Sequence, residues 1–203
     1  MKRAIVIGAT GTIGSAINQL LQNQGYEVIK ASRHSEQIID IEDPESIRTF
    51  FEKSGPVDAI ICAAGDASFG AFSELTDDQI KVGLNSKLMG QVNLCRIGLP
   101  KLKANGVIVL TGGIFAHQPW PQTTNIAMAN AGIEGFTKAL ALELTEGCRV
   151  LVVHPPLVKE TAEAMQMDGS ECAPASAVAK AYLQCLESVK TGTAIYVNEP
   201  SVA

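Results

Sequence analysis

Hydrophobic and polar positions follow two patterns along this chain, one typical of strands and one typical of helices. Short apolar runs, typical of buried strands, occupy residues 3–7, 27–31, 57–63, 107–111, 149–154 and 194–197. Between them lie longer segments with helical spacing at residues 15–23, 76–103 and 125–144, and further helices are expected after Asp43 and near Pro174. This alternation predicts an α/β fold, a single doubly wound parallel sheet with helices on both faces.

Local signals refine the expected elements. Asp43 is placed to cap a helix whose first residue is Pro44, and Thr76 with Gln79 forms a capping box. A short apolar piece at residues 37–41 follows the second strand too closely for a crossover helix, so we expect a short edge strand. The irregular stretch at residues 155–173 is expected to form a mobile lid.

Length and composition narrow the class of protein. The 203 residues and 46% hydrophobic content suit one domain covering residues 1–203. A net charge of -5 argues against a nucleic-acid partner. No apolar run reaches the roughly 18 residues that a membrane helix needs, and the strand pattern that begins at residue 3 leads us to expect no signal peptide. Five scattered cysteines without a C-x-x-C pair favour a cytoplasmic setting and small buried side chains over a metal site.

A glycine-rich turn joins the first strand to the first helix. It contains Gly8, Thr10, Gly11, Thr12, Ile13 and Gly14. Glycine lets the backbone turn sharply and approach a pyrophosphate, and a helix N-terminus offers free N–H groups to the same anion. In this strand–turn–helix context the spacing predicts a dinucleotide-binding site, and the alternative is a tight turn without a ligand.

Further segments carry a family resemblance. Residues 62–65 read Cys-Ala-Ala-Gly, residues 131–144 contain Gly135-Phe136-Thr137-Lys138, and Pro155 follows the strand at 149–154. With the glycine turn, they resemble the short-chain dehydrogenase/reductase family over essentially the whole chain. The resemblance implies a Rossmann-type fold and hydride transfer between a nicotinamide cofactor and a small carbonyl or alcohol. It also implies cofactor contacts from the glycine turn and from Cys62, Ala63, Ala64, Gly65, Asn85, Pro155 and Val158.

The family's catalytic positions are altered in this sequence. The family uses a serine, a tyrosine and a lysine four residues after the tyrosine, and the resemblance places Gly113, Ile126 and Asn130 there. Only Asn85, at the place of the family's helix asparagine, is kept. Isoleucine cannot donate a proton, and asparagine carries no charge to lower a pKa. We therefore assign no catalytic residue by this pattern.

Two other side chains are candidates for proton chemistry. His117 lies in a loop expected to border the substrate pocket, either as a proton shuttle or, as we favour, as an exposed loop residue. Lys87 follows Asn85 by two residues, so in an α-helix it points roughly 200° away and is expected not to share its site.

The residues after the second strand indicate which cofactor is bound. Ser32 and Arg33 stand where folds that prefer NAD carry an acid, and an arginine accommodates a 2′-phosphate. We therefore expect NADP(H), with a solvated loop cation as the alternative for Arg33. Asp40 and Ile41 resemble the family's adenine-contacting pair, although Asp40 equally suits a turn before a helix.

The expected partners are a dinucleotide, an unidentified small-molecule substrate and further copies of the chain. The helices at 76–103 and 125–144 correspond to those that pair between subunits in the family, so we expect a homodimer or homotetramer. Two functions stay open: an NADP-dependent oxidoreductase using a displaced acid or a bound water, and an inactive dinucleotide-binding sensor or scaffold. A nucleotide-sugar or isomerase-type activity is a weaker third reading.

Overall fold

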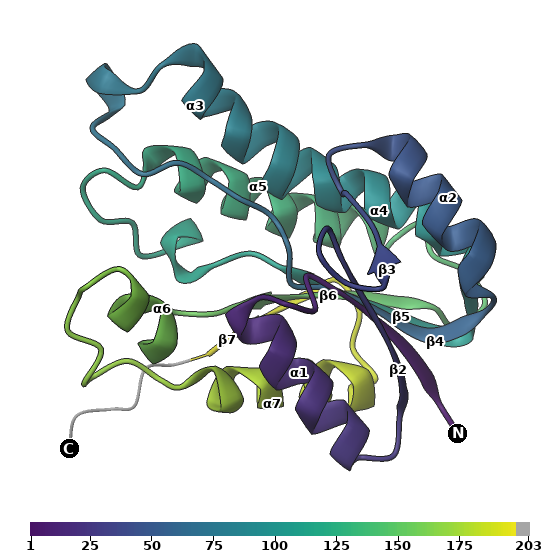
Figure 1. Ribbon diagram of the computed structural model, residues 1–203. Helices are drawn as coiled ribbons and strands as arrows, with labels where there is room; N and C mark the ends of the chain where they lie inside the picture. Colours follow the sequence, from purple (N-terminus) through teal and green to yellow (C-terminus); the bar gives the residue numbers. More distant parts are fainter. Residues whose placement is uncertain (198–203) are drawn as a thin grey trace.

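A seven-stranded sheet forms the centre of the computed structural model, which describes residues 1–197 (Figure 1). Its strands pair in parallel in the order β3-β2-β1-β4-β5-β6-β7. They are β1 (Arg3–Ile7), β2 (Glu27–Ser32), β3 (Gln37–Ile38), β4 (Val57–Cys62), β5 (Leu102–Thr111), β6 (Arg149–His154) and β7 (Thr193–Tyr196). The strand order reverses between β1 and β4, the point at which doubly wound sheets open a ligand-binding crevice at their carboxyl edge.

Helices cover both faces of the sheet, as predicted. In Figure 1, α1 (Thr12–Asn23) and α7 (Ala175–Glu187) lie on one face, and α2 (Pro44–Ser54), α4 (Gly90–Gly98) and α5 (Thr124–Leu140) lie on the other. Successive side chains of β1 point to opposite faces of the sheet and pack against the helices on each face. Val6 packs in the core under α1 and α7, and its neighbours Ile5 and Ile7 pack in the core of the opposite layer. Burial on both faces explains why the strands are continuously apolar.

The predicted helix at residues 76–103 is a succession of shorter elements. It comprises α3 (Asp77–Val82), the π-helical turn η2 (Gly83–Met89), α4 and the 3₁₀ turn η3 (Leu99–Lys101). The capping box of Thr76 and Gln79 is present at its start, and Asp43 caps α2 with Pro44 in the first turn. The π-helical turn is the main difference from the regular helix expected here, because it has more residues per turn.

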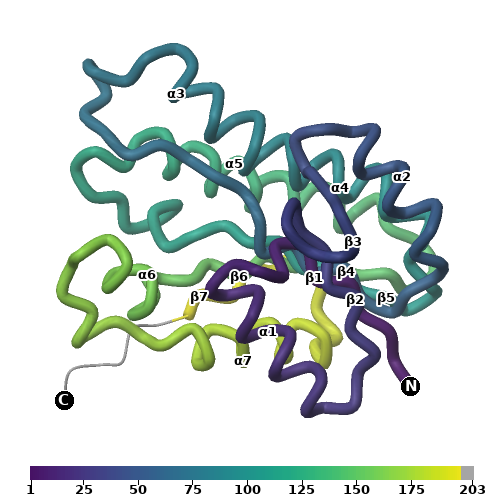
Figure 2. The backbone as a smooth tube through the Cα atoms, viewed as in Figure 1, coloured from purple at the N-terminus to yellow at the C-terminus, as the bar shows by residue number. Residues whose placement is uncertain are grey.

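Shorter elements complete the chain. β3 is a two-residue edge strand, and Figure 2 shows the chain reaching it from β2 through a short loop without a helix, as expected. The segment at 155–173 is not wholly irregular, because it contains α6 (Lys159–Ala164). The remaining elements are the 3₁₀ turns η1 (Phe72–Glu74) and η4 (Ile114–Ala116). Among residues 1–197, no helix has the length and apolar character needed to cross a membrane.

Candidate functional site

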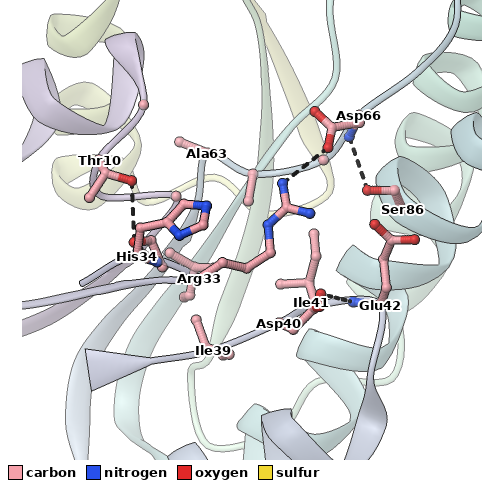
Figure 3. A pocket seen from close by; sticks show the side chains of 16 residues that line it. Thr10, Arg33, His34, Ile39, Asp40, Ile41, Glu42, Ala63, Asp66 and Ser86 are labelled. Atoms are coloured by element: carbon pink, nitrogen blue, oxygen red, sulfur yellow. Dashed lines mark hydrogen bonds and ion pairs between the residues drawn. The ribbon is translucent and has the colours of Figure 1, made fainter. Parts of the chain in front are cut away.

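A pocket of about 220 Å³ opens at the carboxyl edge of β1, β2 and β4, beside the switch point of the sheet. Figure 3 shows side chains from the loops after these strands converging on it. The lining residues are Ile7, Gly8, Thr10, Gly11, Ser32, Arg33, His34, Ile39, Asp40, Ile41, Glu42, Ala63, Ala64, Gly65, Asp66 and Ser86. We call this the nucleotide pocket.

The glycine turn forms one wall of the nucleotide pocket. Gly8 adopts a φ of +82°, and a Cβ there would lie 2.6 Å from the Ala63 carbonyl oxygen. A Cβ on Gly14 would lie 2.1 Å from the Gly8 carbonyl oxygen, so the turn closes only with glycine at both positions. Helix α1 begins after Gly11 without a side-chain cap, which leaves its first N–H groups available to an anion.

Polar side chains cross the mouth of the pocket. The Arg33 guanidinium reaches over it to Asp66, with Nη2 and Oδ2 3.3 Å apart, and both side chains are more than half exposed (Figure 3). Thr10 Oγ1 donates a hydrogen bond to Ser32 Oγ at 3.2 Å. Asp66 N donates to Ser86 Oγ at 3.1 Å. Exposure screens the Arg33–Asp66 pair, so it is a weak restraint that a more highly charged ligand can displace.

The structure brings most of the predicted cofactor-binding residues to this pocket. Those that line it are Gly8, Thr10, Gly11, Ser32, Arg33, Asp40, Ile41, Ala63, Ala64 and Gly65. Thr12, Ile13, Gly14, Cys62, Asn85, Pro155 and Val158 do not line it. The Val158 side chain lies in the hydrophobic core, and the Cys62 thiol is fully buried, with a pKa raised to about 11 by that burial. Asp66 and Ser86 line the pocket and carry no distinctive sequence signal.

Asn85 does not line the nucleotide pocket, and its contact with a cofactor stays a prediction. Asn85 is exposed, whereas Ser86 and Lys87 are buried, and Ser86 contributes to the nucleotide pocket. Lys87 and Asn85 lie on opposite faces of the segment, as their two-residue spacing predicts, but Lys87 is the one that faces inward. Both residues lie in the π-helical turn η2.

A second group of residues gathers beyond the nucleotide pocket, at the end of β5. A Cβ on Gly113 would lie 2.6 Å from Asn130 Nδ2, so two of the family's three altered catalytic positions are in contact. Asn130 is fully buried, and neither its Nδ2 nor its Oδ1 has a hydrogen-bond partner among the described residues. Ile126, one turn earlier on α5, is half-buried.

Charged and aromatic side chains lie beside Gly113 at the ends of β6 and β7. Glu134 Oε1 accepts a hydrogen bond from Lys138 Nζ at 2.5 Å, and Oε2 accepts one from the Tyr196 hydroxyl at 3.1 Å. His117 Nε2 lies 2.5 Å from the same Oε2. His154 Nε2 lies 3.3 Å from it, outside hydrogen-bond geometry. We call this set the acid–histidine cluster: Glu134, His117, His154, Tyr196 and Lys138.

The cluster fixes the charge of its members. Burial alone would raise the pKa of Glu134, but hydrogen bonds from Lys138, His117 and Tyr196 outweigh it and hold that pKa at about 2. Burial and the Glu134 carboxylate raise the pKa of Tyr196 to about 12. Burial lowers the pKa of His154, whose Nδ1 lies 3.0 Å from the Gly113 nitrogen and 2.9 Å from the Gly113 carbonyl oxygen. At neutral pH, Glu134 is therefore ionised and His154 is neutral.

The cluster also revises the expectation for His117. Its side chain is half exposed, but it is held between Glu134 and Tyr196, whose hydroxyl lies 2.7 Å from His117 Nε2. It is therefore more than a solvated loop residue. Sequence reasoning missed Glu134 and Tyr196 because their roles depend on contacts between distant parts of the chain.

Comparison with known proteins identifies the class to which this fold and site belong. A family model described as short chain dehydrogenase matches residues 2–171, and the chain therefore belongs to the short-chain dehydrogenase family. The family is one of oxidoreductases that use nicotinamide dinucleotides. The resemblance seen in the sequence is thereby confirmed, together with the doubly wound α/β fold.

Individual relatives show how far the likeness extends. The protein lin1944 from Listeria innocua is 36% identical, with 98% of this chain and 100% of that chain covered and a TM-score of 0.92. A small-chain dehydrogenase crystallised in complex with NADPH is 31% identical, with 97% and 96% covered and a TM-score of 0.89. The 3-oxoacyl-(acyl-carrier-protein) reductase FabG of Rickettsia conorii is 27% identical over 176 residues, which are 78% of this chain and 73% of FabG.

Proposed function

We propose that this protein binds NADP(H) in the nucleotide pocket and acts as an oxidoreductase on a small carbonyl compound or alcohol. The observation that carries the proposal is the end of β2, where Ser32 and Arg33 line the pocket in place of an acid. In dinucleotide folds this position meets the ribose 2′ substituent, and an arginine favours a 2′-phosphate. The likeness to a dehydrogenase that carries NADPH supports the same choice.

The residues present fit such a cofactor. Gly8 and Gly11 allow close approach of a pyrophosphate to the N-terminus of α1, and Arg33 is exposed enough to exchange Asp66 for a phosphate. The buried, unpartnered amide of Asn130 marks a further polar subsite at the end of β5. When bound, the reduced dinucleotide supplies the hydride for carbonyl reduction.

Titration with the two cofactors tests this proposal. We expect the wild type to bind NADPH more tightly than NADH, as measured by calorimetry. Arg33→Ala removes one charge-assisted hydrogen bond of about 1.5–3 kcal/mol, so NADPH affinity should fall about tenfold or more while NADH affinity stays unchanged. Arg48→Ala is the matched control, because Arg48 is also exposed and paired with an acid but does not line the pocket.

The same titrations can contradict the proposal in two ways. Tighter binding of NADH than NADPH by the wild type would overturn the assignment of NADP(H). Binding of neither cofactor would overturn the oxidoreductase function itself. Turnover is then measured by NADPH consumption across a panel of small aldehydes and ketones.

A second candidate function is a dinucleotide-binding sensor without turnover. The observation that favours it is the chemistry at positions 113 and 126, where Gly113 and Ile126 offer no group able to give or take a proton. Tight NADPH binding without turnover on the carbonyl panel would support this alternative, and robust turnover would exclude it.

We also propose that the protein is a cytoplasmic homodimer or homotetramer. Free cysteines, with none of the five in a disulfide, suit a reducing compartment. Met89 of η2 and Met128 of α5 are exposed apolar side chains on the two helical segments expected to pair between subunits. Light scattering at micromolar concentration tests the assembly.

A further inference from the structure

Lys87 is a largely buried lysine whose side chain has no recorded partner. Its residue is 8% exposed, and among residues 1–197 no hydrogen bond or ion pair is recorded for its Nζ. Burying an unpaired cation is unfavourable, because the charge loses its hydration without gaining a counter-ion. A residue that served only to stabilise the fold would be better replaced by an apolar side chain at this position. The unpaired charge therefore points to a ligand.

Backbone contacts fix where the Lys87 side chain starts. Gly65, just after β4, packs directly against it, since a Cβ on Gly65 would lie 2.9 Å from Lys87 Cα. The Gln91 amide donates to the Lys87 carbonyl at 3.0 Å and to the Thr111 carbonyl at 2.9 Å, and it accepts from the Thr111 N–H at 2.9 Å. These bonds tie η2 to the last residue of β5.

The electrostatic environment shows where the charge lies. Burial lowers the pKa of Lys87, and the groups of Cys62 and Asp66 at the end of β4 act in the opposite direction. The Lys87 charge in turn contributes to the lowered pKa of His154 at the end of β6, after burial as the main cause. Together with the contact between Gly65 and the Lys87 side chain, these effects put Lys87 near the carboxyl ends of β4 and β6.

Asn130 supplies a second unsatisfied group at the same edge. It is fully buried, and both polar atoms of its amide lack a partner among the described residues. The amide occupies the space into which a side chain at position 113 would project, because a Cβ on Gly113 would lie 2.6 Å from its Nδ2. Glycine at 113 and asparagine at 130 are thus a matched pair, in which the amide replaces the family's serine side chain.

Lys87 and Asn130 lie on two helical segments that pack against each other. Segments η2 and α5 pack side by side in the same direction, with Gly83 against Asn125 and Leu88 against Gly132. Position 87 of η2 and position 130 of α5 lie between these two contacts. The two residues therefore lie on neighbouring segments close to the end of β5.

We propose that Lys87 donates the proton in carbonyl reduction while the Asn130 amide N–H holds the substrate oxygen. The inference rests on the proposed oxidoreductase function. The hydride forms the new C–H bond, the C=O π bond opens, and its electron pair on oxygen takes a proton from Lys87 Nζ. The products are the alcohol, the oxidised dinucleotide and a neutral Lys87 amine, which regains its proton from water. Lys87 and Asn130 then replace the tyrosine, lysine and serine that the chain lacks.

The lowered pKa of Lys87 is consistent with this role. An ammonium group whose pKa lies nearer to neutrality transfers its proton more readily than an exposed lysine does. The active form is the protonated one, so kcat should fall as the pH rises through the lowered pKa. The titratable groups that face Lys87 are Cys62, Asp66 and His154.

Three lysine variants test the proposal with two independent readouts. In Lys87→Met we expect kcat to fall at least about 100-fold, the lower end of the contribution of a general acid, with NADPH affinity changed less than about threefold. Lys87→Arg keeps the charge but not a transferable proton, so it should not restore kcat. Lys81→Met, at an exposed position of α3, is the matched control. Carbon-13 NMR of labelled lysine, with the Lys87 signal assigned by its loss in Lys87→Met, should show titration below the other lysines.

The outcomes separate this inference from the function on which it rests. A wild type that turns over no carbonyl compound overturns the oxidoreductase function and the inference with it. Turnover that survives in Lys87→Met, or is restored in Lys87→Arg, overturns the inference alone, as does a Lys87 signal that titrates with the exposed lysines. Lys87→Met removes a buried unpaired charge, so we expect its thermal unfolding temperature to equal or exceed that of the wild type.

Discussion

Replacing Glu134 by glutamine tests the energetics of the acid–histidine cluster. The folded-state pKa of Glu134 is held at about 2, below its ordinary value of 4.5. A difference of this size corresponds to about 3 kcal/mol of stability at neutral pH. We therefore expect Glu134→Gln to lower the free energy of unfolding by about 3 kcal/mol at pH 7, because the amide keeps the shape but loses the charge that Lys138 and His117 pair with.

The sign of the pH dependence follows from the direction of the shift. The folded state binds the Glu134 proton more weakly than the unfolded chain does, so the contribution is fully present above pH 4.5 and is lost as the pH falls through 4.5 toward 2. The gap between wild type and variant should therefore be widest at neutral pH and close progressively in acid. Taking the difference cancels the contribution of Asp58, another carboxylate with a lowered pKa.

Urea unfolding followed by circular dichroism at several pH values measures this gap. At a slope of about 1–3 kcal/mol per molar, the midpoint at pH 7 should fall by about 1–3 M urea. Glu143→Gln serves as the control, because Glu143 is exposed and outside the cluster, and it should change stability by less than about 0.5 kcal/mol. A loss in Glu134→Gln that stays constant from pH 7 to pH 3 would refute the charge-based reasoning, as would a loss below about 1 kcal/mol at pH 7. Protomer concentration is held fixed throughout.

Three further predictions concern the core, the glycine turn and the assembly. The hydroxyl groups of Tyr182 and Thr111 are buried 2.6 Å apart, so Tyr182→Phe should lower unfolding stability by about 1–3 kcal/mol, measured in urea. Gly14→Ala places a methyl group 2.1 Å from the Gly8 carbonyl oxygen, so calorimetry should show NADPH affinity reduced at least about tenfold. Retained affinity would show that the backbone of the turn can shift to accommodate the methyl group. Met128→Glu puts a charge on the exposed face of α5, and light scattering should report a smaller species, whereas an unchanged mass would place the interface elsewhere.

The nucleotide pocket was largely predictable from the sequence because its signals are local. The turn from Gly8 to Gly14 needs glycine for contacts within its own few residues and with the adjacent strand end. Ser32 and Arg33 follow a strand whose apolar pattern is clear, so their place at its carboxyl edge follows from the strand alone. Likewise, Asp43 marks a helix start by its own hydrogen bond to a backbone N–H two residues on.

The group of residues at the ends of β5, β6 and β7 was not predictable in the same way. The π-helical turn η2 has no simple sequence signal, and the two-residue spacing of Asn85 and Lys87 does not say which of them faces inward. Glu134 was visible within a family-like segment, but its partners come from a loop and from the last strand. Asn130 illustrates a third difficulty. Its replacement of a lysine looks like a simple loss in the sequence, and the contact with Gly113 is visible only in the folded chain.

Tyr196 lies near the end of the described chain, so the acid–histidine cluster can form only late in synthesis. The residues that line the nucleotide pocket extend no further than Ser86, so a growing chain contains all of them before β5 has been made. The cluster instead waits for β7, because Tyr196 reaches back 62 residues to Glu134 and 79 residues to His117. Contacts of such long sequence separation form slowly. We therefore expect a folding chain to order the segments that line the nucleotide pocket first, and to complete the acid–histidine cluster only when the final edge strand docks.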